Sequence, residues 1–315
     1  MLDWTDRHCR YFLRLISQHS VLYSEMITTG AILYGDTERH LAMSAQEQPV
    51  ALQLGGSDPK DLAAVCKIAD NYAYSEINLN CGCPSDRVQN GMFGAVMMKN
   101  AKITADCVAA MIDATTLPVT VKHRIGVDDF DSYDFLCQFV GTVAASGCST
   151  FLVHARKAWL QGLSPKQNRE VPELNYDRVY QLKKDFPDLE FIINGGISTL
   201  DESVTHLNNI DGVMLGREAY TNPYILSQVD RIIYGDEKPI KTREKIAEEF
   251  VEYVDNEMVK GVKLNAMTRH ILGLYHGMPG ARQFRRHISE NAYKSTATID
   301  VLINALKFTS GASTR

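Results

Sequence analysis

The stretch that decides the fold reads EINLNCGCPSDRVQNG and runs from Glu76 to Gly91. Its first half alternates apolar and polar residues, as a strand with one packed face does. Its second half contains Gly82 and Pro84, followed by serine and aspartate, which end a strand and favour a sharp loop. Asn80 and Cys83 are therefore predicted at the C-terminal end of a strand, where parallel α/β folds bind their ligands.

The side chain of Cys83 suits chemistry at such a strand end. The following proline restricts Cys83 to an extended backbone, which holds the thiol at a fixed angle. Thiols are mostly protonated at neutral pH, so Cys83 could act as a proton donor as well as a nucleophile. The alternative interpretation is a small buried hydrophobic residue without a chemical role.

Outward from this stretch, short apolar strands alternate with amphipathic helices. Strands are predicted at residues 21–27, 49–55, 75–80, 118–123, 150–154, 190–194 and 212–215, and helices at 6–18, 59–69, 104–114, 133–145, 176–185, 200–207 and 221–233. This alternation predicts βα units and a parallel sheet. A closed (β/α)8 TIM barrel needs eight strands, so we expect the first strand to be missing or truncated.

The pattern changes after Gly235. Residues 242–259, 264–275, 281–294 and 299–308 all read as helices, and no strand is predicted between them. Four helices separated by Gly and Pro signals indicate a small bundle. We therefore predict a barrel domain at residues 1–235 and a helical domain at residues 236–315.

Composition limits the class of protein. The 315 residues have 45% hydrophobic content and a net charge of −5, which argues against nucleic-acid binding over the whole surface but not on a local basic face. No apolar run approaches the roughly 20 residues of a membrane span, and no signal peptide is visible. Seven cysteines without framework spacing indicate reduced thiols in the cytoplasm, and no Cys/His pairs have the spacing of a zinc site.

Two strand ends carry glycines that could hold a phosphate. The strand at 190–194 runs into Asn194-Gly195-Gly196, and the strand at 212–215 ends in Gly216-Arg217. In barrels, the loops after the last two strands commonly bind phosphate through backbone N–H groups, to which Arg217 could add a charge-assisted bond. Alternatively, the glycines only turn the chain.

Three further polar residues lie at predicted strand ends: Gln53, Lys122 and His154. Each has a structural interpretation, as a core amide, a solvated lysine or a satisfied histidine. Their shared position nevertheless directs all three toward one barrel mouth. No G-x-G-x-x-G motif follows a strand, so a Rossmann site for NAD is not supported.

Two segments are locally basic. The loop at 155–169 combines Arg, Lys and Trp, and the segment at 280–287 places Arg282, Arg285 and Arg286 on one helix face. Such clusters suit phosphate and RNA, although a charged run is often only a solvated surface.

Taken together, these motifs resemble the tRNA-dihydrouridine synthases. Residues 78–95 resemble the active-site segment of that family, and the longer form resembles its DusA subfamily; residues 1–10, 154–169, 194–196 with 216–217, and 276–291 also match. The resemblance implies an FMN-binding TIM barrel followed by a helical tRNA-binding domain. It also implies reduction of a uridine in the tRNA D-loop, around positions 20 and 20a, with NADPH as the transient reductant.

The resemblance also implies roles for individual residues. Cys83 would protonate C5 of the uracil after hydride transfer to C6. The positions that match FMN ligands are Met1, Leu2, Gln53, Lys122, His154, Asn194, Gly195, Gly196, Gly216 and Arg217, and those that match tRNA contacts are Asn80, Lys166, Arg169, Arg282 and Arg285. The departures are the missing first strand, which ends Ala-Pro-Met in the family, and the residues Cys81 and His123.

Two other functions remain open from the sequence. One is an FMN barrel oxidoreductase that acts on a free pyrimidine, as dihydroorotate dehydrogenase does; the helical tail and the cluster at 282–287 argue against it. The other is a tRNA-binding protein whose catalysis is lost with its first strand. We expect no stable protein partner, no membrane association and a monomeric state.

Overall fold

The computed structural model describes residues 1–85, 88 and 91–309. Four residues of the decisive stretch, Asp86, Arg87, Gln89 and Asn90, lie outside the described residues. The described chain forms two compact units. The first comprises Met1 and residues 21–216, and the second comprises residues 2–20 and 217–315.

This division differs from the predicted boundary near Gly235. The compact units separate at Gly216, and the first helix belongs to the second unit rather than to the barrel. The assignment of cofactor binding to residues 1–235 and of tRNA binding to residues 236–315 stays a prediction.

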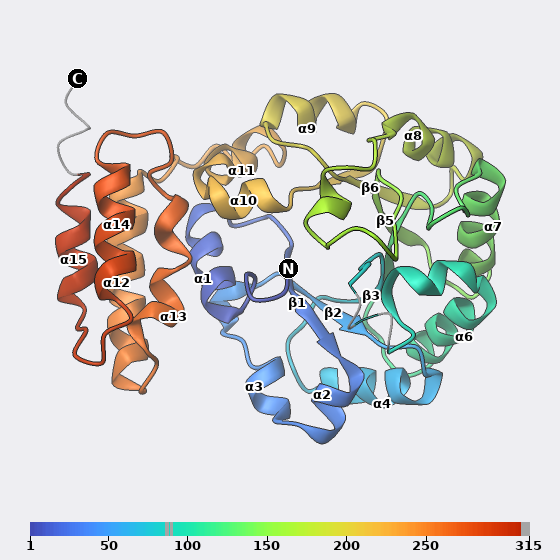
Figure 1. Cartoon of the computed structure of the whole chain (residues 1–315), viewed down its shortest axis with the longest axis horizontal. Helices are drawn as coiled ribbons and strands as arrows, with labels where there is room; N and C mark the ends of the chain where they lie inside the picture. The colour runs from blue at the N-terminus through green and yellow to red at the C-terminus, as the bar shows by residue number, and fades with distance from the viewer. Residues whose placement is uncertain (86–87, 89–90, 310–315) are drawn as a thin grey trace. The chain divides into compact units, whose positions relative to one another are not determined.

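The first unit is built on a parallel sheet whose strands follow one another in chain order, β1 to β7 (Figure 1). The strands are β1 (Leu22–Thr28), β2 (Val50–Gly55), β3 (Glu76–Cys81), β4 (Val119–Arg124), β5 (Thr150–His154), β6 (Glu190–Asn194) and β7 (Gly212–Met214). All seven expected strands are confirmed. The sheet curls like a TIM barrel, and in the described residues β1 and β7 are its two edges.

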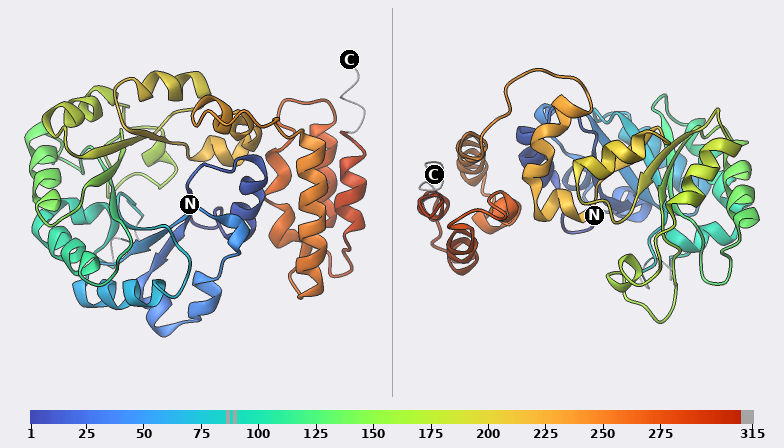
Figure 2. Two further views of the ribbon diagram at one scale, coloured as in Figure 1. Left: turned by 180° about the vertical axis from the view of Figure 1, so that it is seen from behind. Right: turned by 90° about the horizontal axis from the view of Figure 1, so that it is seen from above.

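Helices cover the outer face of the curled sheet, as the view from behind in Figure 2 also shows. They are α2 (Thr29–Tyr34), α3 (Thr37–Leu41), α4 (Pro59–Ala69), α6 (Ala101–Ile112), α7 (Tyr133–Ala144), α8 (Tyr176–Asp185) and α9 (Leu200–Leu207), with short 3-10 segments at Ala45–Glu47, Gly94–Lys99 and Gln167–Arg169. The longer helices lie within a few residues of their predicted bounds. The short helices α2 and α3 were not predicted.

Strand alternation gathers polar side chains of β2, β3 and β4 on one face of the sheet. In β3, Ile77, Leu79 and Cys81 are fully buried and alternate with Asn78 and Asn80. Because successive side chains of a strand point to opposite faces, the polar set shares one face, which is the inner face of the curl. Polar side chains of β2, β3 and β4 are joined there by hydrogen bonds. Gln53, Asn78, Asn80 and Lys122 therefore face the interior of the first unit, whereas His123, on the other face, packs against Phe139 of α7.

The second unit contains only helices among its described residues. They are α1 (Arg7–Ile16), α10 (Arg217–Thr221), α11 (Val229–Ile232), α12 (Arg243–Val259), α13 (Leu264–Thr268), α14 (Ala281–Asn291) and α15 (Asp300–Leu306), with 3-10 segments at Pro223–Gln228 and Ile271–Gly273. α1 packs on α12 through Phe12 against Phe250, with ring centroids 5.0 Å apart, and through the ion pair of Arg7 with Glu257 at 2.7 Å.

The predicted single helix at 221–233 was wrong. The chain forms α10, then a 3-10 segment that begins at Pro223, and then α11. Proline has no N–H to donate and clashes with the preceding turn, which explains why one continuous helix does not form. The predicted helix at 264–275 is likewise divided into α13 and a 3-10 turn. Among the described residues, no helix combines the length and the apolar character needed to cross a membrane.

Candidate active site

The loop that carries Cys83 begins where β3 ends and is held by the side chain of Asn80. Asn80 Oδ1 accepts hydrogen bonds from the backbone N–H of Gly82, at 3.1 Å, and of Cys83, at 2.9 Å. Its Nδ2 donates to Gln53 Oε1 on β2, at 2.8 Å. Such side chain to backbone bonds are how asparagine fixes a turn. Three predicted site residues, Gln53, Asn80 and Cys83, are therefore directly connected.

The far side of the same loop is held by the segment that follows it. Ala95 N donates to Cys83 O at 2.9 Å, and Gly94 has a φ of +73°. A Cβ on Gly94 would lie 2.6 Å from Cys83 O and would also collide with Val88 Cγ1. Only glycine fits here, both by conformation and by space. Cys83 itself is half-buried, and its Sγ lies 3.5 Å from the Oγ of Ser85.

Arg124, at the end of β4, is a site residue that sequence reasoning missed. Its Nε donates to Gly82 O at 3.0 Å, and its Nη1 donates to Lys157 O and Asn168 O at 3.2 and 2.9 Å. The side chain is almost completely buried, and burial lowers the pKa of its guanidinium to about 10, so it remains a cation at neutral pH. Arg124 thus links the Cys83 loop to the basic loop after β5.

Lys122 lies two residues before Arg124 on the same face of β4 and contacts Asn194. Its Nζ donates to Asn194 Oδ1 at 3.0 Å, and Asn194 Nδ2 donates to Met214 O at 2.7 Å. Burial, together with the nearby charge of Arg124, lowers the pKa of Lys122 to about 7. The charge of a Cys83 thiolate would raise the pKa of both Lys122 and Arg124.

His154 and the glycines after β6 form the next part of the site. His154 pairs in register with Asn194, and a Cβ on Gly195 would lie 3.2 Å from His154 Cε1. Burial and the surrounding arginines and lysine hold the pKa of His154 well below its usual value, so the ring is neutral. Its Nδ1 is buried and has no hydrogen-bond partner among the described residues. A buried polar atom without a hydrogen-bond partner is a candidate contact for a bound ligand.

The two loops predicted to hold phosphate have the required backbone. Gly195 and Gly196 have φ values of +114° and +76°, which only glycine adopts readily. Gly195 O accepts a hydrogen bond from Tyr176 Oη at 2.7 Å, which anchors the turn. No atom of the described chain lies within 4 Å of a Cβ built on Gly216, so there is open space beside that backbone.

The basic loop after β5 is organised around the fully buried Asn168. Asn168 Nδ2 donates to Trp159 O at 2.8 Å, and its Oδ1 accepts from Trp159 N at 2.8 Å. Lys166 and Arg169, the predicted RNA contacts of this loop, flank Asn168 on the 3-10 turn. Lys166 is exposed and Arg169 is half-buried.

The other predicted site residues divide between the units. Met1 belongs to the first unit, whereas Leu2 and Arg217 belong to the second, and Leu2 is 57% exposed. Arg282 and Arg285 are exposed on α14 in the second unit, one turn apart. The roles assigned to all these residues stay predictions.

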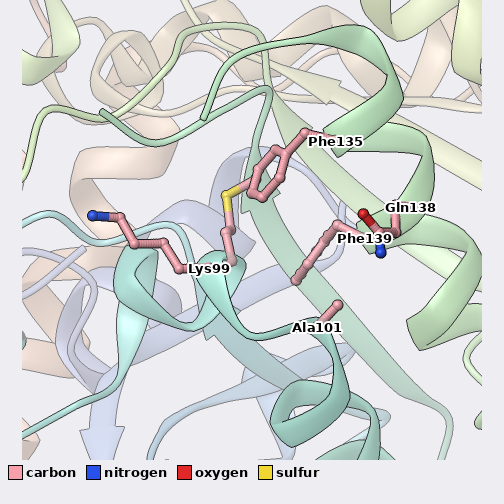
Figure 3. A pocket seen from close by; sticks show the side chains of 6 residues that line it. Lys99, Ala101, Phe135, Gln138 and Phe139 are labelled. Carbon is pink, nitrogen blue, oxygen red and sulfur yellow. The ribbon is translucent and has the colours of Figure 1, made fainter. Parts of the chain in front are cut away.

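A pocket lies elsewhere in the first unit (Figure 3). It lies between the start of α6 and α7 and is lined by Met98, Lys99, Ala101, Phe135, Gln138 and Phe139. None of the predicted site residues lines it. Among the described residues, no group of His, Cys, Asp and Glu side chains could hold a metal ion.

A curled parallel sheet with a thiol, a lysine and glycine turns at its carboxyl edge defines an enzyme of the barrel class. The family model described as dihydrouridine synthase (Dus) matches residues 1–310. The chain therefore belongs to the dihydrouridine synthase family.

Curated relatives agree with this assignment. The tRNA-dihydrouridine(20/20a) synthase of Escherichia coli (strain K12) is 59% identical over 98% of this chain and 89% of its own length. The protein of the same name from Vibrio cholerae is 58% identical over 97% of this chain and 94% of its own length.

Proposed function

We propose that this protein reduces specific uridines of tRNA to 5,6-dihydrouridine, with bound flavin mononucleotide and with NADPH as the reductant. Relatives that share 58–59% of its residues carry the name tRNA-dihydrouridine(20/20a) synthase, which points to positions 20 and 20a as targets. The observation that carries the proposal is the position of Cys83. Asn80, at the end of β3, holds the loop that contains Cys83, and Asn80 pairs in register with Lys122 on the neighbouring strand β4.

The residues present fit a flavin. The partnerless Nδ1 of His154 and the cationic form of Lys122 supply hydrogen-bonding capacity for a polar ring edge. The positive-φ turn at Gly195-Gly196 and the open backbone at Gly216 suit a phosphate, because their N–H groups can approach an anion closely. We assign the ring to Gln53, Lys122 and His154.

The phosphate we assign to Asn194, Gly195, Gly196, Gly216 and Arg217, with Met1 and Leu2 as further flavin contacts. A flavin held by these residues would supply the hydride, taken from NADPH, that C6 of the uracil receives.

Cys83 completes the reduction as the general acid. Its Sγ–H donates a proton to C5 of the base, so that hydride and proton together saturate the C5–C6 bond, and the thiolate regains its proton from solvent. Arg124, whose Nε donates to Gly82 O next to Cys83, places a positive charge beside the loop that carries the thiol. The target base must leave the tRNA stack to reach such a site.

Asn80 would orient the base. Its Oδ1 is engaged by two backbone N–H groups, and one of its two Nδ2 protons is donated to Gln53. One amide proton remains for a carbonyl of the uracil. Lys166, Arg169, Arg282 and Arg285 would contact the tRNA backbone, because arginine and lysine are the side chains that bind phosphate. The setting for this reaction would be the cytoplasm, with the protein as a monomer.

The test is to incubate the protein with unmodified tRNA, flavin mononucleotide and NADPH, and then to analyse the digested tRNA by mass spectrometry. We expect one uridine of the D-loop to gain the mass of two hydrogens. A parallel incubation with dihydroorotate and an electron acceptor should show no turnover. Turnover of dihydroorotate together with unchanged tRNA would overturn the proposal.

A further inference from the structure

Polar side chains form a continuous row of hydrogen bonds across the inner face of the first unit. The row starts at Asn80, below the Cys83 loop, and ends at Glu76 at the beginning of β3. Its bonds run from Asn80 Nδ2 to Gln53 Oε1 at 2.8 Å, from Gln53 Nε2 to Asn78 Oδ1 at 3.0 Å, from Asn78 Nδ2 to Thr120 Oγ1 at 2.7 Å, and from Thr120 Oγ1 to Glu76 Oε1 at 2.5 Å.

The hydrogen bonds of the row run from donor to acceptor in one direction, and the bond between Thr120 and Glu76 sets this direction at one end. Thr120 Oγ1 donates its single proton to Glu76 Oε1; burial raises the pKa of this carboxyl, and the hydrogen bonds from Thr120 and Tyr23 oppose that shift. Thr120 Oγ1 is then an acceptor, and Asn78 must turn its amide nitrogen toward it. The second donor to Glu76 is Tyr23 Oη, at 2.8 Å, which agrees with a carboxylate that accepts only.

The direction then passes through the two remaining amides. Because Asn78 directs its side-chain oxygen toward β2, Gln53 must donate to it through Nε2. The oxygen of Gln53 therefore faces Asn80, which must donate through Nδ2. Asn80 Oδ1 is left to face the loop, where the N–H groups of Gly82 and Cys83 can only donate. Both ends of the row require the same orientation of all three amides.

We propose that Thr120 and Asn78 are positioning residues for Cys83, which set the orientation of Asn80 through Gln53 and so hold the loop that presents the thiol to the substrate. Neither residue contacts this loop by a hydrogen bond in the described structure, and both are almost completely buried, Thr120 at 3% and Asn78 at 0% exposure. The role rests on the proposed function, in which Cys83 is the proton donor.

The test compares Thr120→Val with Thr120→Ser. Valine keeps the shape but removes the hydroxyl, so Asn78 Nδ2 loses its acceptor and the orientation of the three amides is held from the loop end alone; serine keeps the hydroxyl. In flavin-loaded protein, Thr120→Val should lower kcat for tRNA reduction about 10- to 100-fold, because small misplacements of a reacting group cost this much, with KM for tRNA unchanged. Thr120→Ser should restore kcat to within a few-fold of the wild type.

Amide hydrogen exchange gives a readout that does not need turnover. In Thr120→Val the peptide that contains Gly82 and Cys83 should exchange faster, while peptides from β5 and β6 keep their wild-type rates. The matched control is Thr150→Val, because Thr150 Oγ1 also donates to a carboxylate on the next strand, Glu190 Oε2 at 2.9 Å, but belongs to no part of the row that reaches the loop. It should leave both kcat and exchange unchanged.

A second variant can replace Thr120→Val if that variant does not fold. Asn78→Leu keeps a similar side-chain shape but removes the amide, so Gln53 Nε2 loses its acceptor and Thr120 no longer connects to Asn80; it should show the same local exchange and the same reduction of kcat. Unchanged exchange at Gly82 and Cys83, or exchange that rises equally throughout the first unit, would overturn the proposal. If wild-type protein does not reduce tRNA, the proposed function fails, while the exchange difference still decides whether the row holds the loop.

Discussion

Lys122 is a site residue whose pKa is strongly lowered by the fold. Burial is the main cause, and the nearby charge of Arg124 adds to it; together they lower its pKa from 10.5 to about 7. The lowered value means that the charged form is penalised in the folded protein, so the proton is lost as pH rises through about 7 rather than near 10.5. The positive charge that we assign to flavin binding is therefore fully present only below neutral pH in the flavin-free protein.

This gives a prediction for flavin-free protein that carries 13C-labelled lysine. One Cε signal should titrate near pH 7 and should be absent from Lys122→Met. Lys99→Met is the control, because Lys99 forms an ion pair with Asp128 at 2.7 Å, away from this cluster, and it should leave that signal in place. A spectrum in which every lysine titrates near its ordinary value would contradict the environment described for Lys122.

Single residues were predicted best where position in a strand decides their direction. Gln53, Asn80, Lys122 and His154 end on one sheet edge because parallel strands carry their C-terminal residues to the same side. Arg124 ends β4 in phase with Lys122, but its contacts could not be found in this way. Its partners Lys157 and Asn168 lie 33 and 44 residues further along the chain, in a loop whose path no local pattern encodes.

At the scale of elements, the Cys83 loop depends on the close approach of the segment after it. Gly94 has a φ of +73°, and a Cβ there would collide with Val88 and Cys83. Gly94→Ala should therefore destabilise the protein by more than the roughly 1 kcal/mol of an alanine at positive φ, and should also slow uridine reduction.

Gly261→Ala is the matched control for this prediction. Gly261 has a φ of +89°, but no described atom lies within 4 Å of a Cβ built there. It should show only the cost of backbone strain and keep its activity. Chemical denaturation and the rate of uridine reduction measure both effects; equal effects in the two variants would show that the close approach to Cys83 is unimportant.

Regular elements were predicted wherever the pattern spans several turns or a full strand. β5, β6, α8 and α9 begin and end as expected, because their apolar spacing is complete. α2 and α3 have only six and five residues, too few for a helical period to be seen. The prediction of one helix at 221–233 followed the apolar spacing and did not take Pro223 into account. Proline lacks the N–H that a continuous helix needs at this position, so the chain forms a 3-10 segment there instead.

At the scale of the whole molecule, the protein itself carries a net charge of −5, yet its proposed substrate, tRNA, is a polyanion. Binding must then depend on local clusters, such as Arg282 and Arg285, which are exposed on α14. Substituting both by glutamine should weaken tRNA binding and reduce the salt dependence of log K by about one unit for each phosphate that is no longer neutralised.

The control for the arginine cluster is the double substitution to lysine, which keeps both charges and should retain most of the affinity. Binding curves at several salt concentrations, measured with unmodified tRNA, separate the two variants. If the glutamine variant binds with the slope and affinity of the wild type, α14 is not a tRNA surface.

The account as a whole depends on the thiol of Cys83 as the proton donor to the base. The most direct test is a single turnover, in which flavin-loaded protein is first reduced by NADPH and then mixed with unmodified tRNA while flavin absorbance is followed. Cys83→Ala should be reduced by NADPH at the wild-type rate but should be reoxidised by tRNA about 10²–10⁴-fold more slowly, the usual contribution of a general acid. Cys137→Ala, at the other half-buried cysteine, should behave as the wild type. Reoxidation of Cys83→Ala at the wild-type rate would contradict the account.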